Sequence, residues 1–383
     1  MVISGKNKRI CIIAHQCYDA GGLSVAKDMI TTIGRALPEH DYFIIVPSEK
    51  GFDDICKEIP NCQTFEYTRA RGLIRRWIDE TFLIPKVIKN YKPDLLLCLG
   101  DRGMVDPPCK QVIYFHRPVL VYPAKHYSTE TLRNKLLFSY HSMFLKKCLR
   151  STSMVICQTR IIEKRLREKY NYHGDILIST PSIAFAKNPL EPFEIPEDLK
   201  RYKNKYRLFY PARYHPHKNH QVIIECFNKF RNELKDIVII LTVAKDQHPN
   251  VLKLLKQIDT LGLSEQIVNL GRIPYDKIPA YYQHCDALLM PTMLETFGLP
   301  YIEAMHLGLP ILTSDLDFTR YVCGDAAMFF DPSDAKSVMK AIFEVKNNPS
   351  LTEKLISNGR DRLRNLADSW EEVSMQMINT LTT

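Results

Sequence analysis

Residues 291–314, PTMLETFGLPYIEAMHLGLPILTS, indicate the fold of this chain. The apolar run at 287–290 stops at Pro291, which is typical of the carboxyl end of a buried strand. A turn that contains glycine follows, and a helix is expected to begin near Pro300 and to end at Gly308, before a second strand. This order predicts a β-α-β unit of an open parallel sheet, which binds ligands beyond the carboxyl ends of its strands.

Two glutamates flank the predicted ligand position. Glu295 lies in the turn, and Glu303 lies one turn inside the helix. The free amides of a helix N-terminus suit an anionic oxygen, and carboxylates accept hydrogen bonds from hydroxyl groups. Together they favour a polyhydroxylated phosphate ester, meaning a nucleotide sugar. The alternative is an ordinary β-α-β crossover whose glutamates are solvated.

This stretch resembles the donor-binding signature of retaining family 4 glycosyltransferases, which have the GT-B fold. The resemblance rests on Glu295, Phe297, Gly298, Leu299, Pro300, Glu303, Ala304, Met305, Gly308, Pro310 and Ser314. It implies an α/β protein with GT-B architecture, in which two Rossmann-like domains with parallel sheets face a cleft. It also implies that Glu303 binds the nucleotide ribose. It further implies that Glu295 and the turn that follows it face the transferred sugar and phosphates. The turn comprises Thr296, Phe297, Gly298 and Leu299.

The length of 383 residues suits two domains. An acidic, proline-containing stretch at 186–204 is expected to link an N-terminal Rossmann-like acceptor-binding domain, 1–185, to a nucleotide-sugar-binding domain, 205–365. The resemblance implies that residues 366–383 form a helix that crosses back to the first domain. The resemblance covers most of residues 205–380. In residues 1–185 it extends only to the general order of strands and helices.

Positive charge is concentrated in the first half of the chain. Residues 1–185 hold 28 Lys and Arg against 18 Asp and Glu, whereas residues 186–383 hold 24 against 25. A helix expected at 128–150 combines an apolar face with basic flanks. Such a helix either packs on the sheet with a solvated basic side or rests on an anionic membrane surface. The charge excess favours peripheral membrane contact.

The expected compartment is the cytoplasm, with the inner face of the membrane as a second location. No stretch reaches the roughly 20 apolar residues of a spanning helix, and the first residues lack a secretory signal pattern. Eleven cysteines are scattered singly without a C-x-x-C pair, which is typical of reduced, buried thiols.

Two motifs in the first half point to the same ligand. Gly21 and Gly22 lie between a predicted strand and a predicted helix, where glycine lets the backbone approach a phosphate or a sugar; a simple tight turn is the alternative. His116 follows the apolar strand 112–115, so it is placed at a carboxyl end. The resemblance implies that both motifs face the donor, with His116 near the reacting sugar. A structural histidine is the alternative for His116.

Two cations at the start of the second half suit a diphosphate. Arg213 follows the strand 206–210, and Lys218 lies just ahead of the next helix. Arginine supplies a fork and lysine a point charge, so the pair can clamp phosphates; solvated surface charge is the alternative. The resemblance implies that both neutralise the leaving nucleotide diphosphate, and that the segment with Arg272 lies beside the base.

The same turn carries His215, His217 and His220, which superficially resemble a metal site. No cysteine or acidic residue lies nearby in sequence, and Lys218 competes for the space, so no metal is expected.

The sequence therefore predicts a retaining, metal-independent hexosyltransferase without a cofactor. It would move mannose or a similar hexose from a GDP- or UDP-linked donor to a glycan or lipid-linked acceptor, in cell-surface polysaccharide or glycolipid synthesis. His116, Arg213, Lys218 and Glu295 are the predicted catalytic residues. The alternatives are a catalytically silent nucleotide-sugar-binding subunit and another GT-B enzyme, such as a sugar-nucleotide epimerase. Nucleic-acid binding is not expected, because no aromatic-basic reader motif occurs.

Overall fold

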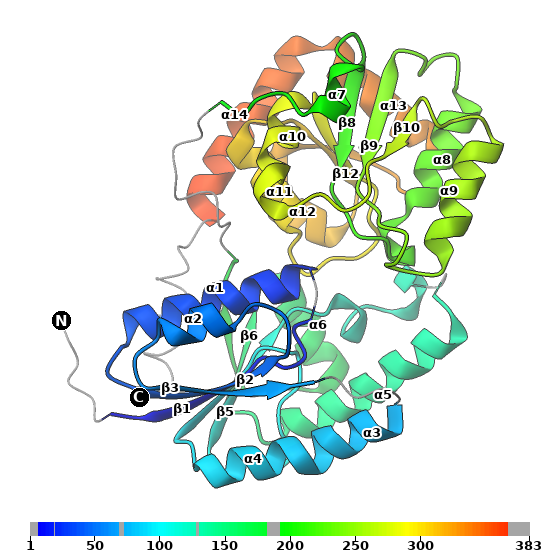
Figure 1. Ribbon diagram of the computed structural model, residues 1–383. Coiled ribbons are helices and arrows are strands. Elements are labelled where there is room, and N and C mark those ends of the chain that lie inside the picture. The colour runs from blue at the N-terminus through cyan, green and yellow to red at the C-terminus, as the bar shows by residue number, and fades with distance from the viewer. Residues whose placement is uncertain (1–6, 19, 69–72, 128–129, 182–191, 367–383) are drawn as a thin grey trace. The chain divides into compact units, whose positions relative to one another are not determined.

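The computed structural model describes residues 7–18, 20–68, 73–127, 130–181 and 192–366. The described chain forms two compact units (Figure 1). The first unit holds residues 7–121 and 132–181, and the second holds residues 122–131 and 192–366. Each unit is built around one parallel sheet.

The sheet of the first unit has seven strands, all parallel, in the order β3-β2-β1-β4-β5-β6-β7. The strands are β1 (Arg9–Ile13), β2 (Asp41–Pro47), β3 (Cys62–Tyr67), β4 (Leu95–Cys98), β5 (Lys110–Phe115), β6 (Met154–Cys157) and β7 (Asp175–Ile178). The strand order changes direction between β1 and β4, which makes this the topological switch point of the sheet.

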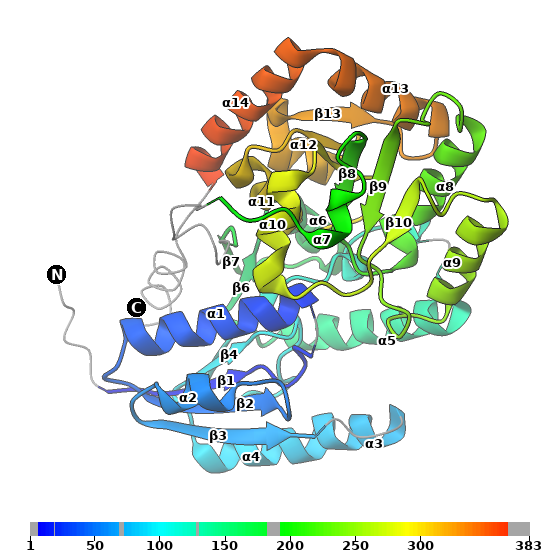
Figure 2. The ribbon, with the colours of Figure 1, turned by 45° about the horizontal axis from the view of Figure 1, so that its top comes forward.

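Helices cover both faces of this sheet. They are α1 (Ala20–Ala36), α2 (Asp53–Lys57), α3 (Leu73–Ile78), the π-helix η1 (Asp79–Leu83), α4 (Ile84–Tyr91), α5 (Leu132–Leu149) and α6 (Arg160–Tyr170). Figures 1 and 2 show α1 and α2 on one face, and α3 and α4 on the other. The central strands are accordingly apolar throughout, as expected for a parallel sheet covered on both sides.

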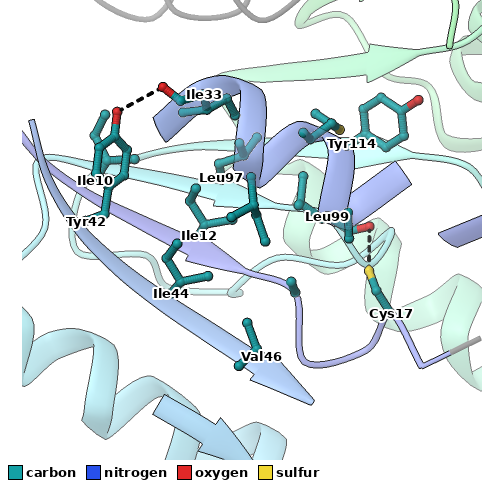
Figure 3. Close-up of a cluster of buried hydrophobic side chains, with 14 of the residues drawn as sticks. Ile10, Ile12, Cys17, Ile33, Tyr42, Ile44, Val46, Leu97, Leu99 and Tyr114 are labelled. Carbon is teal, nitrogen blue, oxygen red and sulfur yellow. Dashed lines mark hydrogen bonds between the residues drawn. The ribbon is translucent and has the colours of Figure 1, made fainter. Parts of the chain in front are cut away.

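The core beneath α1 is made by alternate residues of the central strands. Figure 3 shows Ile12, Ile44 and Leu97, from three neighbouring strands, gathered under the helix. Two polar groups within this core form hydrogen bonds. The Tyr42 hydroxyl donates to the backbone oxygen of Leu37 at 2.8 Å, and the Cys17 thiol donates to the backbone oxygen of Leu99 at 3.4 Å. The core therefore has satisfied hydrogen bonds at both ends of the strands.

The sheet of the second unit has six parallel strands in the order β10-β9-β8-β11-β12-β13. They are β8 (Tyr206–Tyr210), β9 (Ile237–Leu241), β10 (Ile267–Asn269), β11 (Ala287–Met290), β12 (Ile311–Ser314) and β13 (Ala327–Phe330). Its switch point lies between β8 and β11. Two parallel sheets with flanking helices confirm the α/β prediction.

The helices of the second unit are α7 (Glu197–Lys200), α8 (His220–Lys229), α9 (Asn250–Thr260), α10 (Ile278–His284), α11 (Leu299–Leu307), α12 (Asp317–Cys323), α13 (Ala335–Asn347) and α14 (Pro349–Leu366). Helices α8 and α13 pack against each other (Figures 1 and 2). In the β11-α11-β12 unit, the helix begins at Leu299 and Gly308 ends it in a left-handed conformation. The β-α-β unit predicted from residues 291–314 is confirmed.

The structure differs from the sequence-based outline in three places. Gly21 and Gly22 lie in the first turn of α1, and not in a loop before it. The stretch expected to be linker contains α7, which Leu199 and Tyr202 anchor by burying their side chains. Residues 122–131 group with the second unit, although they lie within the range predicted for the first domain.

The helix predicted within 366–383 falls on residues outside the described part, apart from Leu366, the last residue of α14. In the described part of the chain, no helix combines the length and the apolar character needed to cross a membrane.

Candidate functional site

Lys218 and Glu295 meet at the switch point of the second sheet. Lys218 lies in the connection after β8 and Glu295 in the connection after β11, and these strands are neighbours in the sheet. The Lys218 ammonium donates a hydrogen bond to Glu295 Oε1. Both side chains are largely buried, with 16% and 14% of their surface exposed. The structure thus brings together two of the predicted catalytic residues, which are far apart in sequence.

A backbone hydrogen bond holds these two connections against each other, and a tyrosine hydroxyl fixes the first of them. The Met293 amide donates to the His217 carbonyl at 2.8 Å, and the Tyr210 hydroxyl donates to the Lys218 carbonyl at 2.6 Å. Thr292 Oγ1 lies 3.3 Å from Glu295 Oε1 and donates to it. Tyr210 and Thr292 were not predicted from the sequence. Their positions at the ends of β8 and β11 are the signal that would have found them.

The turn before α11 requires glycine at position 298. Gly298 has a φ of +88°, and a Cβ atom added there would lie 2.6 Å from the ring of Tyr301. Phe297 is 1% exposed and Thr296 is 7% exposed, so both side chains point into the protein interior. Any donor contact made by Phe297 therefore belongs to its backbone, and Leu299 supplies the first residue of the helix.

Glu303 is a buried carboxylate held by two tyrosines. Its side chain accepts hydrogen bonds from Tyr282 at 2.8 Å and from Tyr275 at 3.2 Å, one on each oxygen. Burial raises the pKa of Glu303 to about 6, while the two tyrosine hydroxyls favour ionisation. Tyr275 is 45% exposed, so one of the two partners lies at the surface. A carboxylate has further lone pairs, which leaves Glu303 able to accept hydrogen bonds from a ligand.

The two predicted arginines have different surroundings. Arg213 is half-buried and lies close to His215 of the histidine turn. Arg272 forms an exposed ion pair with Asp246 at 3.2 Å. Arg272 is thus engaged at the surface, while Arg213 stays close to the connection that carries Lys218.

The three histidines of this turn stack on aromatic rings. His215 and His217 lie parallel with ring centroids 5.2 Å apart, and His220 packs on Tyr214. Burial lowers the pKa of His220 to about 3. In the described ranges, no group of three or more His, Cys, Asp or Glu is arranged as metal ligands.

A segment from the first half of the sequence completes this unit. Glu130 is buried, and its Oε1 lies 3.9 Å from Nδ1 of His217, next to Lys218. The Tyr122 hydroxyl donates to Asp317 at 3.3 Å. Sequence reasoning missed Glu130, because nothing in its local pattern shows that it packs beside a turn so distant in sequence.

The remaining predicted residues belong to the first unit, where Gly22 lies against His116. A Cβ atom at position 22 would come within 3.3 Å of Nε2 of His116, so glycine permits this approach; Gly21 has open space around it. Asp101, which follows β4, accepts hydrogen bonds from the backbone amides of His116 at 2.6 Å and of Arg117 at 2.7 Å.

The Asp101 carboxylate is fully buried, and its Oδ2 lies 3.3 Å from Nε2 of His116. Burial lowers the pKa of His116, and the charge of Asp101 opposes that shift. Sequence reasoning missed Asp101, although the Gly100-Asp101 pair at a strand end marks the same edge of the sheet.

Residues 192–362 match the model of the family described as Glycosyl transferases group 1. The chain is 24% identical over 246 residues to O-antigen chain mannosyltransferase B of Escherichia coli, covering 63% of each protein. It is 24% identical over 210 residues to O-antigen chain mannosyltransferase RfbU of Salmonella typhimurium, covering 55% of this chain and 56% of that protein. The matches therefore span about three fifths of the length of these relatives.

Solved structures show the same fold over the whole chain. Sucrose-phosphate synthase from Thermosynechococcus elongatus superposes with a TM-score of 0.75 at 16% identity, covering 98% of both chains. HepE of Anabaena, in complex with UDP-glucose, gives 0.74 at 15% identity, covering 98% of this chain and 100% of that one. These likenesses confirm the GT-B architecture.

Proposed function

We propose that this chain, whose residues 192–362 form a glycosyl transferases group 1 domain, is a retaining hexosyltransferase that needs neither a metal ion nor a cofactor. It transfers mannose or a similar hexose from a nucleotide diphosphate sugar to a glycan or lipid-linked acceptor. The setting is cell-surface polysaccharide or glycolipid synthesis at the cytoplasmic face of the membrane.

One observation carries this proposal: Lys218 and Glu295 are in contact at the switch point of the second sheet. Ligands of open parallel sheets bind at this point. The ammonium suits a phosphate, and the carboxylate suits a sugar hydroxyl. In a nucleotide sugar, the bond that breaks during transfer joins the sugar to a phosphate. A site that holds a phosphate next to a sugar therefore suits this bond.

The proposed mechanism places positive charge where negative charge develops. As the sugar–phosphate bond breaks, Lys218 and Arg213 stabilise the departing diphosphate, which is the task a metal ion performs in other transferases. Glu295 orients the sugar, and Glu303 accepts hydrogen bonds from the ribose. The acceptor hydroxyl attacks on the leaving-group side and passes its proton to a phosphate oxygen, so the anomeric configuration is retained.

The donor is proposed from the relatives. The O-antigen chain enzymes of Escherichia coli and Salmonella typhimurium are named mannosyltransferases, which supports a mannosyl donor. HepE was solved with UDP-glucose, which supports a uridine nucleotide as the competing choice. The second candidate function is a silent nucleotide-sugar-binding subunit, which the clustered Lys218 and Glu295 argue against.

The first test is a thermal-shift panel of GDP, UDP and their hexose conjugates at pH 7.5, where Glu303 is ionised because its pKa is about 6. A ligand present at 100 times its Kd stabilises the native state by about 2.7 kcal/mol, so one nucleotide series is expected to raise the Tm by several degrees. Glu303→Ala is expected to lose this shift.

A hydrolysis assay with the stabilising donor distinguishes an enzyme from a silent subunit. The assay measures the free hexose that hydrolysis releases. A shift without any turnover supports the silent subunit, and no shift with any nucleotide rejects the donor site altogether. Glu265→Ala, which changes an exposed glutamate before β10, is the matched control and is expected to keep both signals.

Membrane contact is proposed for the first unit. Trp77 on α3, Phe82 on η1, and Leu132, Leu136 and Met143 on α5 expose between 48% and 74% of their surface. Lysine and arginine side chains on α3 and α5 accompany them. An apolar surface with cations suits an anionic bilayer interface.

Co-sedimentation with vesicles that contain phosphatidylglycerol checks this contact. Leu132→Ser/Leu136→Ser is expected to weaken binding by about 100-fold, since two buried apolar side chains contribute about 1.5 kcal/mol each. Leu252→Ser, which removes a 58% exposed leucine from the second unit, is the control. Equal binding by all three proteins would place the contact elsewhere.

A further inference from the structure

Glu303, the carboxylate proposed to hold the ribose, is covered by side chains of its own unit. It is 5% exposed, and each of its oxygens accepts a hydrogen bond from a tyrosine hydroxyl. The remaining lone pairs serve a ribose only where its hydroxyls have an open approach to one of these oxygens. The tyrosine that closes this approach therefore decides how the nucleotide binds.

Tyr282 is fixed in the core of the second unit. It lies on α10, which packs against α11, the helix of Glu303 (Figures 1 and 2). Its side chain is fully buried, and its ring lies edge-on to that of Phe209 with the centroids 5.1 Å apart. Its hydroxyl is 2.8 Å from Glu303 Oε2 and 3.5 Å from the carbonyl oxygen of Pro300. Withdrawing this ring would leave a hole in the core, so the Oε2 side of the carboxylate stays closed.

Tyr275 lies at the surface instead. It is 45% exposed and belongs to η6 (Tyr275–Lys277), a 3-10 helix of three residues. Its hydroxyl donates to Glu303 Oε1 at 3.2 Å, which is longer than the usual range of about 2.5–3.0 Å between two such oxygens. Residues 270–274, which precede η6, have no regular secondary structure, and Gly271 has a φ of +76° there. A movement of the Tyr275 side chain therefore uncovers Oε1 without opening the core.

We infer that Tyr275 is the displaceable cover of the ribose site, an inference that rests on the proposed function. In the free protein, its hydroxyl occupies the approach to Glu303 Oε1. When a nucleotide binds, a ribose hydroxyl replaces the phenol as the donor to Oε1, and the phenol turns toward solvent. The exchange runs in reverse after transfer, so Tyr275 competes with the nucleoside diphosphate product and favours its release.

This exchange fixes the sign of the effect that Tyr275 has on affinity. A nucleotide that must break the hydrogen bond between Tyr275 and Glu303 gains only the difference between that bond and the new one. Without the phenol hydroxyl, Oε1 lacks this donor in the free protein, and the whole of the ribose hydrogen bond contributes to binding. A hydroxyl that only oriented Glu303 for the ribose would act in the opposite sense, because its loss would weaken binding.

Isothermal titration calorimetry of the full chain with GDP and with UDP measures this effect, at about pH 8, where Glu303 is ionised because its pKa is about 6. Tyr275→Phe keeps the ring and removes only the hydroxyl. It is expected to bind the nucleotide about 3- to 10-fold more tightly than the wild type does. Tyr275→Leu, which also lacks the hydroxyl, is expected to change affinity in the same direction. Tyr321→Phe, at a half-buried tyrosine of α12 in the same unit, is the matched control and is expected to bind as the wild type does.

The 2′,3′-dideoxy forms of GDP and UDP test whether the ribose makes the exchange. They lack both hydroxyls that replace the phenol, so Tyr275→Phe is expected to bind them no more tightly than the wild type does. A merely structural effect of the substitution would change the affinity for the ribose and dideoxyribose forms alike.

Two results would overturn the inference and leave the proposed donor site intact. The first is nucleotide binding that Glu303→Ala abolishes, but that a folded Tyr275→Phe protein keeps unchanged or weakened. The second is a gain in affinity for Tyr275→Phe that persists with the dideoxy nucleotides. If the wild type binds neither GDP nor UDP, or if Glu303→Ala binds them as tightly as the wild type does, the proposed donor site is rejected and the inference with it.

Discussion

Lys218→Ala is expected to lower the rate of hexosyl transfer by about 100- to 1000-fold, the usual cost of removing one preorganised group that stabilises transition-state charge. The effect should fall mainly on kcat, because the charge on the departing diphosphate is larger in the transition state than in the bound donor. Lys218 is suited to this role because its contact with Glu295 holds it at the switch point of the sheet. Steady-state kinetics with the donor identified by the thermal-shift panel make the measurement.

The matched control for this prediction is Lys253→Ala, which removes an exposed lysine from α9 in the same unit. It is expected to leave kcat unchanged. Lys218→Ala also leaves Glu295, whose side chain is 14% exposed, without its cation, so loss of stability must be separated from loss of catalysis. A folded Lys218→Ala protein that keeps kcat within about threefold of the wild type would show that this lysine does not stabilise the leaving group.

The residues of the proposed donor site are the ones whose local structure the sequence predicts best. Glu295, Gly298 and Glu303 lie in one short stretch whose strand, turn and helix follow directly from proline, glycine and apolar runs. Lys218 could be predicted because it lies at the N-terminal end of a helix after a strand. What local pattern cannot supply is the partner of each group. That Lys218 meets Glu295, and that Tyr282 and Tyr275 hold Glu303, depends on which strands are neighbours in the sheet.

Roles that depend on packing between distant segments could not be predicted from the sequence. Phe297 belongs to the signature, yet its ring is buried, so its side chain serves the core. Glu130 belongs to the second unit although it lies in the first half of the sequence. No periodicity in the sequence predicts this placement.

Asp101→Ala is expected to destabilise the first unit by about 3–5 kcal/mol, the range found when one partner of a buried charge network is removed. Asp101 is fully buried, it accepts two short backbone hydrogen bonds, and its Oδ2 lies 3.6 Å from Nε of Arg117. Its φ of +65° adds to the cost, because alanine in this left-handed conformation is disfavoured by about 1–2 kcal/mol. Urea unfolding in a Trp370→Phe background, followed through Trp77, reports the first unit.

Asp101→Asn separates the hydrogen bonds from the charge, because asparagine tolerates the left-handed conformation and keeps an amide oxygen as acceptor. Its stability is expected to lie between those of the wild type and Asp101→Ala. The sign of the electrostatic effect on His116 is fixed: Asp101 opposes the lowering of the His116 pKa that burial causes, so the asparagine variant should show a still lower pKa for His116 in an NMR titration. Asp106→Asn, which alters a 90% exposed carboxylate in the same connection, should change stability by no more than about 0.5 kcal/mol. If Asp101→Asn and Asp106→Asn behaved alike, the position of His116 beside Gly22 could not be attributed to the buried carboxylate.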